Sequence, residues 1–122
     1  MRLNRKTISA LTLFILAPFV LVGCDAIAKS NFKAAKGIAL YNNGRYNEAV
    51  VPLKEAIQTR AEHGKAHYYL ALTYMKLGKK EEATSLLKSY LAQAAETKAW
   101  LGAIDKEYIA KCKELVFRQG GE

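Results

Sequence analysis

The chain contains 122 residues, of which 51% are hydrophobic and 25% are charged. At this length one compact domain is expected, and the apolar content excludes an intrinsically disordered chain. Lysine and arginine total 19 against 11 acidic residues, and there are two cysteines. Two cysteines are too few for a disulfide-stapled miniprotein, and the length excludes a large multidomain enzyme.

The first 24 residues differ in character from the rest of the chain. Arg2, Arg5 and Lys6 precede a stretch from Thr7 to Val22 that is almost wholly apolar. This stretch is short for a membrane-spanning helix, which needs about 20 residues. A positively charged start followed by a short apolar stretch is typical of a signal peptide. Residues 1–23 are therefore predicted to be a cleaved signal peptide.

The signal ends with Leu21, Val22, Gly23 and Cys24, which resembles the lipobox of bacterial lipoprotein precursors. The resemblance implies cleavage before Cys24, a diacylglycerol on its thiol and an N-acyl chain on its new amino group. An uncleaved membrane anchor with an incidental cysteine is the alternative.

Lipidation implies a place in the cell. The mature chain would sit at the periplasmic face of a cell membrane, with residues 24–29 as a lipidated tether. Asp25 follows the cysteine, and resemblance to enteric-type lipoproteins favours the inner membrane over the outer one. The mature part keeps 16 basic against 11 acidic residues. This excess favours anionic lipid headgroups as neighbours, and nucleic acid is not expected as a partner.

The mature sequence contains an internal repeat. Four pairs of residues share one separation along the chain: Gly44 with Gly78, Glu48 with Glu82, Ala49 with Ala83, and Leu53 with Leu87. This period and these positions resemble the tetratricopeptide repeat, a helix–turn–helix unit of about 34 residues. The resemblance covers residues 30–63 and 64–97. It implies an all-α fold, a short solenoid of two repeats plus a C-terminal capping helix.

Small residues and glycines have expected roles within these repeats. The small residues that let the two helices of a repeat approach closely are Gly37, Ala49, Ala71 and Ala83. Gly44 and Gly78 are predicted to end the first helix of each repeat, because a left-handed conformation costs glycine little.

The sequence also departs from the family pattern. Lys33 stands where the family has a large apolar residue, and Phe32 is expected to replace it in part. Ala61 stands at the usual inter-repeat proline. His63 and Gly64 are therefore expected to make the turn between the repeats.

A further helix is predicted over residues 98–117, with 118–122 as a frayed tail. Its apolar face would carry Trp100, Leu101, Ile104, Tyr108, Cys112, Leu115 and Val116. Its polar face would carry Lys98, Asp105, Lys106, Lys113 and Glu114, and Thr97 would cap its start. About three repeats are normally needed for a stable array, so this helix is expected to be structurally obligatory.

The sequence contains no convincing catalytic or metal site. His63 and His67 are four residues apart, but Gly64 interrupts the helix between them and His67 occupies a repeat core position. Cys112 is expected to be a buried small hydrophobe rather than a reactive thiol. No phosphate-binding loop or catalytic triad is present. We expect a non-enzyme without a metal or cofactor other than the acyl chains on Cys24.

Binding is the activity that the resemblance implies. In the family, five positions of each first helix line a concave surface that holds peptides. Here they are Asn31, Ala34, Ile38, Tyr41 and Asn42, followed by Lys65, Tyr68, Leu72, Met75 and Lys76. This strip, called here the concave strip, is aromatic and apolar at its centre with amide and lysine edges. It suits an extended or helical peptide with apolar anchors and some negative charge.

Two residues of the concave strip have an alternative role, and one known binding pattern of the family is missing from it. The alternative for Leu72 and Met75 is packing against the last helix. The carboxylate clamp of chaperone-tail binders is absent, because Ala34 and Ile38 stand where it needs lysine and asparagine.

The sequence thus predicts a lipid-anchored periplasmic protein-interaction module. Such a module would assist the assembly or localisation of a cell-envelope complex, with a membrane-associated protein or peptide as its partner. One alternative is a structural accessory lipoprotein that mainly forms homo-oligomers. Another is a non-catalytic subunit of an envelope enzyme.

Overall fold

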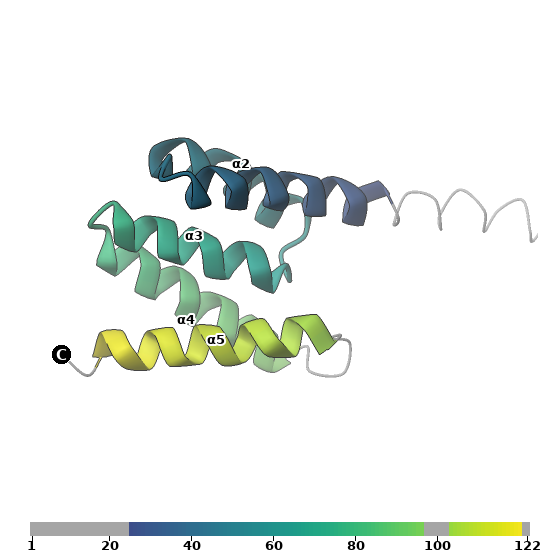
Figure 1. Ribbon diagram of the computed structural model, residues 1–122. Helices are drawn as coiled ribbons and strands as arrows, with labels where there is room; N and C mark the ends of the chain where they lie inside the picture. The colour runs from purple at the N-terminus through teal and green to yellow at the C-terminus, as the bar shows by residue number, and fades with distance from the viewer. Residues whose placement is uncertain (1–24, 97–102, 121–122) are drawn as a thin grey trace, which may run out of the picture.

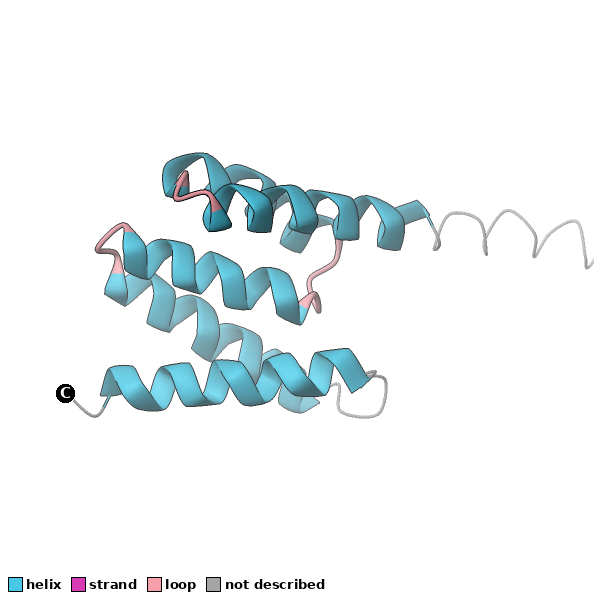
Figure 2. Cartoon of the chain, in the orientation of Figure 1, coloured by secondary structure: helices cyan, strands magenta, loops and turns pink. Residues whose placement is uncertain are grey.

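The computed structural model describes residues 25–96 and 103–120 (Figure 1). Residues 25–42 are helical. They are followed by four further helices: α2 (Tyr46–Thr59), α3 (Gly64–Lys76), α4 (Lys80–Glu96) and α5 (Ala103–Gly120). The described part of the chain contains no strand (Figure 2), which confirms the predicted all-α class.

Some predictions fall outside these ranges and stay predictions. They concern the signal peptide over 1–23, Cys24, the cap at Thr97 and the side chains at positions 98, 100, 101 and 104. Among the described helices, none has both the length and the apolar character needed to cross a bilayer.

The helices form two layers. Helix 25–42, α3 and α5 lie side by side in one layer, and α2 and α4 lie behind them (Figure 1). α3 packs against α2 and α4, and α5 packs against both α3 and α4. Helix 25–42 ends one repeat period before α3 ends, and α2 begins one repeat period before α4 begins. This arrangement confirms a short solenoid of the tetratricopeptide type.

The first helix of each repeat ends in the same way. Gly44 and Gly78 have φ angles of 73° and 75°, in the left-handed region. The amide of Arg45 donates to the carbonyl oxygen of Leu40 at 2.9 Å, and Lys79 donates to Tyr74 at 2.8 Å. These bonds satisfy carbonyl groups that a helix end leaves unpaired. The predicted role of both glycines is confirmed.

Close helix contacts explain the small residues. Ala49, Ala71 and Ala83 are fully buried. At Gly37 a Cβ atom would lie 2.5 Å from Cγ of Leu53, so helix 25–42 and α2 approach too closely for a side chain there. Such complementarity is typical of close-packed protein interiors, where one extra methyl group forces neighbours to move.

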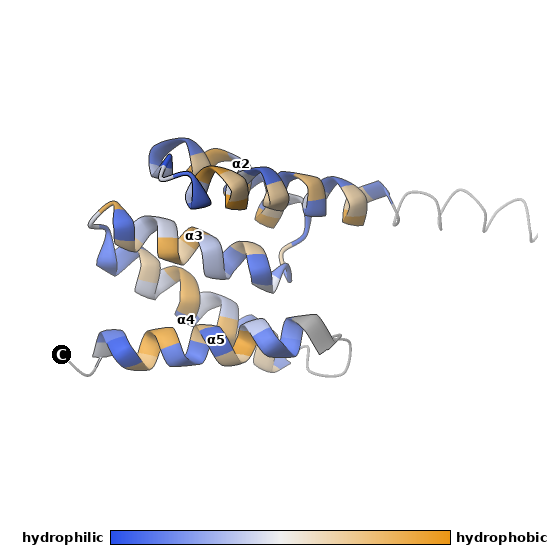
Figure 3. Ribbon diagram, viewed as in Figure 1, coloured by the Kyte–Doolittle hydropathy of each residue, from blue (hydrophilic) through white to orange (hydrophobic). Residues whose placement is uncertain are grey.

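Apolar residues occur as bands along each helix (Figure 3). The core cluster between the second repeat and α5 consists of Ala71, Ala83, Leu87, Tyr90, Ala94 and Cys112. The Cys112 thiol is fully buried, and burial raises its pKa to about 12. This placement agrees with its expected role as a small hydrophobe.

The predicted inter-repeat turn is wrong by one residue. The turn comprises Arg60 to His63, and Gly64 is the first residue of α3. A Cβ atom at Gly64 would collide with Oη of Tyr90. Glycine is therefore required there by a close approach between α3 and α4, not by a turn.

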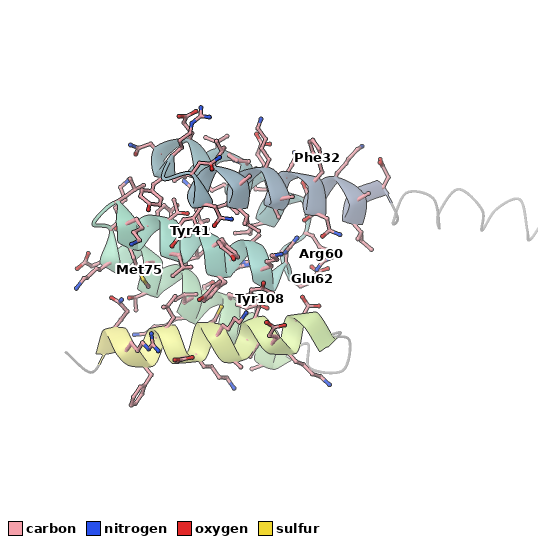
Figure 4. All side chains as sticks on the ribbon, in the orientation of Figure 1. Phe32, Tyr41, Arg60, Glu62, Met75 and Tyr108 are labelled. Carbon is pink, nitrogen blue, oxygen red and sulfur yellow. The ribbon has the colours of Figure 1, made fainter. Side chains whose placement is uncertain are left out.

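Phe32 does not replace the missing core aromatic of the first repeat. Its side chain is 74% exposed and points away from α3 and α5 (Figure 4). Lys33 instead reaches α2, where its Nζ lies 3.3 Å from Oε2 of Glu55. The prediction for Phe32 is wrong because one residue corresponds to about 100° around a helix and turns the ring outward.

The two ends of the described chain also differ from the prediction. Residues 25–29, expected as a tether, are helical and continuous with the first repeat, and Lys29 pairs with Asp25 at 2.6 Å. Residues 118–120, expected in a frayed tail, belong to α5. Arg118 supports that last turn by donating to Glu114 at 2.6 Å. Pairs separated by four residues stabilise helix ends in this way.

Asp105 does not lie on the solvent side of the last helix, so the expectation for this residue is wrong. Its side chain is 18% exposed and lies 3.7 Å from the guanidinium of Arg60. The Arg60 charge on the inter-repeat turn accounts for the inward position of this carboxylate. Lys106, Lys113 and Glu114 are exposed as expected.

Candidate peptide-binding face

The layer formed by helix 25–42, α3 and α5 presents one continuous side, called here the three-helix face (Figure 1). The concave strip belongs to the first two of these helices. α5 lies beside α3 and occupies the place that the first helix of a third repeat would take. The last helix therefore widens the face with its own residues.

The polar edges of the concave strip lie largely in solvent. Asn31, Asn42 and Lys76 are exposed, and Lys65 is half-buried. Amide and ammonium groups in such positions can meet backbone carbonyls or carboxylates of a bound segment. They supply orientation rather than buried contact area.

The apolar centre of the strip is only partly accessible. Ile38, Tyr41, Tyr68, Leu72 and Met75 are half-buried. Ile38 and Tyr41 pack on the core cluster formed by Ala49, Leu53 and Leu70. These side chains therefore serve both the fold and the surface.

Two strip positions contribute less to the surface than predicted. Ala34 is 2% exposed and packs with Ala56 and Ala66 between the repeats, so it does not belong to the accessible strip. Met75 packs against the cluster that contains Cys112, and Nε2 of Gln119 lies 3.5 Å from its sulfur. Met75 thus contacts the last helix, as the alternative for this residue proposed.

Five tyrosine rings follow one another in contact from α2 to α5, and we call them the tyrosine row. In order they are Tyr46, Tyr41, Tyr69, Tyr68 and Tyr108. Their successive ring centroids are 5.4, 5.6, 5.5 and 5.7 Å apart, with tilted or edge-to-face geometry. Aromatic rings at these distances and angles attract one another. The row therefore links the start of α2, helix 25–42, α3 and α5.

The row ends under a cation. Nζ of Lys111 lies 4.7 Å from the ring centroid of Tyr108, and it pairs with Glu107 at 2.6 Å. Figure 4 shows Tyr41, Met75 and Tyr108 on the same side of the molecule. α5 also adds two acidic residues, Asp105 and Glu107, to the three-helix face. The strip of the first two helices contains no acidic residue, whereas the complete face does.

The phenol groups of the row are suited to hydrogen bonding. Burial, followed by the neighbouring tyrosines, raises the pKa of Tyr41, and burial is the largest cause of the raised pKa of Tyr108. Both hydroxyls stay protonated at neutral pH. Within residues 25–96 and 103–120, no hydrogen-bond partner holds the hydroxyl of any of the five tyrosines. Tyrosine combines a large apolar ring with a polar tip, a combination enriched in protein interfaces.

Sequence reasoning did not assign Tyr46, Tyr69, Tyr108 or Lys111 to the face. Tyr69 follows Tyr68 directly, and its ring turns toward Tyr41 of the preceding helix. A signal existed for α5, because its Tyr108 and Cys112 have the same spacing as the buried pair His67 and Ala71. That comparison would have identified α5 as another first helix.

The inter-repeat turn holds a buried polar group at one edge of the face. The backbone amide of Ala66 donates to Nδ1 of His63 at 3.3 Å, which caps the start of α3. Burial, followed by the Arg60 charge, lowers the pKa of His63 to about 4. Figure 4 shows Arg60 and Glu62 at this edge, where the guanidinium lies 3.7 Å from the Glu62 carboxylate. His63 is therefore a neutral structural cap.

Two other features of the described residues bear on chemistry, namely possible metal sites and surface depressions. No group of three or more histidine, cysteine or acidic side chains lies close enough there to hold a metal ion. Two shallow depressions lie along α4, and neither is lined by a residue of the concave strip. Their linings comprise Tyr74, Lys80, Glu81, Glu82, Thr84, Ser85, Leu86, Lys88, Ser89 and Gln119.

Comparison with known proteins agrees with the observed fold. The family model described as the tetratricopeptide repeat matches residues 40–106, which is more than half of the chain. The same comparison found no curated protein and no solved structure that matches this chain.

Proposed function

The chain belongs to the tetratricopeptide repeat family, and from this premise we propose that it is a lipid-anchored periplasmic module that binds a partner protein. Tetratricopeptide repeats generally bind proteins and are typically non-catalytic scaffolds. The bound segment lies along the three-helix face. Through it the module assists the assembly or localisation of a cell-envelope complex whose partner is itself associated with the membrane.

The tyrosine row is the observation that carries the binding proposal. It places a series of aromatic rings across four helices. Four of these tyrosines are half-buried, and Tyr108 is 9% exposed. Within the described residues no hydrogen-bond partner holds their phenol groups. Interfaces draw much of their binding energy from such aromatic residues. Lys65 and Lys76 flank the row, so a segment with apolar anchors and some negative charge complements it.

Capture from membranes with and without an intact row tests this proposal. The Tyr41→Ala and Tyr68→Ala variants are each expected to lose the partner identified by mass spectrometry with the unchanged protein. Tyr74→Ala is a matched control, because Tyr74 lies on α3 but forms none of the ring pairs of the row. It packs on the core clusters, and Nζ of Lys54 of α2 lies 5.9 Å from its ring centroid. Equal capture by all variants of unchanged melting temperature would exclude the three-helix face as the binding site.

The anchor is supported by the sequence around Cys24. A positive start, a short apolar stretch and a cysteine at the lipobox position occur in the order that lipoprotein processing requires. Two or three acyl chains give stable attachment, whereas one chain binds reversibly. Cys24→Ser is expected to abolish palmitate labelling and to leave a larger precursor. Labelling that persists in this variant would exclude Cys24 as the lipidation site.

Which of the two envelope membranes holds the anchor is a separate part of the proposal. Asp25 favours retention at the inner membrane. Fractionation of the two envelope membranes checks this point. Recovery with the outer membrane would contradict it without affecting the anchor.

A further inference from the structure

The first helix carries an exposed stripe that its own fold leaves uncovered. We call the outer stripe the four residues Ala28, Phe32, Ala35 and Ala39, all of which are exposed. Their spacing of four, three and four residues places them on one side of the helix. Ser30, Ala34 and Gly37 are buried on the opposite side. The outer stripe therefore faces away from the rest of the array, as Phe32 shows in Figure 4.

Two large apolar side chains, one in the stripe and one on α2, are strongly exposed. Phe32 is 74% exposed, and Val51 of the neighbouring α2 is 60% exposed. A contiguous exposed apolar patch on a protein surface commonly marks a contact with a protein or a membrane. No described helix covers this end of the solenoid (Figure 1).

The position of the stripe in the chain indicates what covers it. The helix is already formed at Asp25, directly after Cys24 and the apolar segment from Thr7 to Val22. At a rise of 1.5 Å per residue, the outer stripe begins about 6 Å from Cys24 and extends for about 16 Å. A surface reached by the anchor is thus within reach of the whole stripe.

The charges beside the stripe complement an anionic surface. Between residues 25 and 42 there are three lysines, at positions 29, 33 and 36, and one acidic residue, Asp25. Lys29 and Lys33 are ion-paired, whereas Lys36 forms no ion pair with any residue of the described ranges. At about 100° per residue, the three lysines all lie along one edge of the outer stripe. An apolar stripe bordered by lysines is typical of helices that lie in the interface of a bilayer. Lysine stems can bury against lipid while their ammonium groups stay at the headgroups.

We propose that the outer stripe rests on the anionic bilayer surface, with Phe32 inserted among the lipid chains. This inference rests on the proposed lipid anchor. Helix 25–42 lies along the membrane and α5 is the helix farthest from it. The three-helix face then stands across the membrane plane and opens sideways, toward partners held in the same bilayer.

Fluorescence quenching tests the contact in the full chain. Phe32→Trp is made in a Trp100→Phe background, which removes the one native tryptophan. The lipidated protein is placed in vesicles of phosphatidylethanolamine and phosphatidylglycerol, with or without brominated acyl chains. Phe117→Trp in the same background is the matched control, because Phe117 is 81% exposed on α5 at the opposite end of the array.

The expected result is at least twofold quenching of the Phe32→Trp protein by brominated lipid and little quenching of the Phe117→Trp protein. Equal or absent quenching in both, with each protein floating with the vesicles, overturns the contact and leaves the anchor intact. If neither protein floats with the vesicles, both the membrane contact of the stripe and the proposed lipid anchor are overturned. A blue shift that depends on protein concentration, without quenching, assigns the stripe to a second copy of the chain and also overturns it.

Discussion

The imidazole ring of His67 stacks on the phenol ring of Tyr90, with centroids 4.4 Å apart and planes inclined by 21°. This pair joins α3 to α4 in the core of the second repeat, and both residues are at most 5% exposed. The carbonyl oxygen of His63 lies 3.0 Å from Nδ1 of His67. The two histidines are therefore parts of the scaffold, and their titration acts on stability.

Acidification is expected to destabilise the fold. The folded pKa of His63 is about 4, below its ordinary value of 6.5, because burial disfavours the charged ring. Between these values the unfolded chain binds more protons than the folded one, so stability is lost as the pH falls through this window. The loss between pH 7 and pH 5 should be about 2 kcal/mol, as measured by urea unfolding.

A His63→Asn variant separates the contribution of the His63 imidazole to this pH dependence from that of other groups. In His63→Asn the side chain still caps α3, because asparagine is a favourable capping residue. It cannot titrate, so the pH dependence should become shallower. His67, whose pKa burial also lowers, would account for the remainder. An unchanged slope in His63→Asn would contradict the assignment.

Gly64→Ala is expected to destabilise the domain by about 1–3 kcal/mol through overpacking. The added methyl group would collide with Oη of Tyr90 and lie 3.1 Å from Cβ of Tyr108. Combining it with Tyr90→Phe removes the closest atom and should recover part of the loss. Gly120→Ala, with nothing within 4 Å, is the control and should leave the melting temperature nearly unchanged.

Ala83→Leu is expected to cost about 1–3 kcal/mol for the same reason. Ala83 is fully buried in the cluster shared by α3, α4 and α5. Ala92→Leu introduces the same side chain at an exposed position of α4 and should be tolerated. If thermal unfolding shows equal stability for the two variants, the proposed register of the second repeat is incorrect.

Removal of α5 should abolish cooperative unfolding. A fragment that ends at Glu96 loses the contacts of Cys112, Ile109, Leu115 and Val116 with the core cluster. The newly exposed apolar surface should also promote aggregation. Calorimetry and light scattering of residues 25–96 check both effects. A soluble fragment with a sharp transition would show that two repeats are sufficient.

The repeats could be predicted from the sequence because their signals are local. Gly44 and Gly78 occupy equivalent helix ends, and the small residues recur with the same period as these glycines. Each signal reflects the backbone conformation or a contact within one repeat. The helix order and the shared face therefore follow from the repeat pattern.

The place of the last helix could not be predicted in this way because the helix is out of phase. Tyr108 and Cys112 follow His67 and Ala71 at a longer interval than the one that separates Gly44 from Gly78. The tyrosine row could not be predicted from the sequence either, because the rings of Tyr41 and Tyr69 come into contact only when the two repeats pack together. Likewise the Arg60 and Asp105 pair joins segments far apart in the sequence, which no local pattern indicates.

The order of packing in the array also has a kinetic consequence. From α2 to α5, each helix packs on the helix next to it in the chain, and α5 packs also on α3. Proteins dominated by such sequence-local contacts fold in microseconds to milliseconds, since little loop-closure entropy opposes their formation. Folding can start in either repeat and spread to its neighbour. A chain delivered unfolded to its site of action would therefore assemble its binding surface almost as soon as its last helix is free.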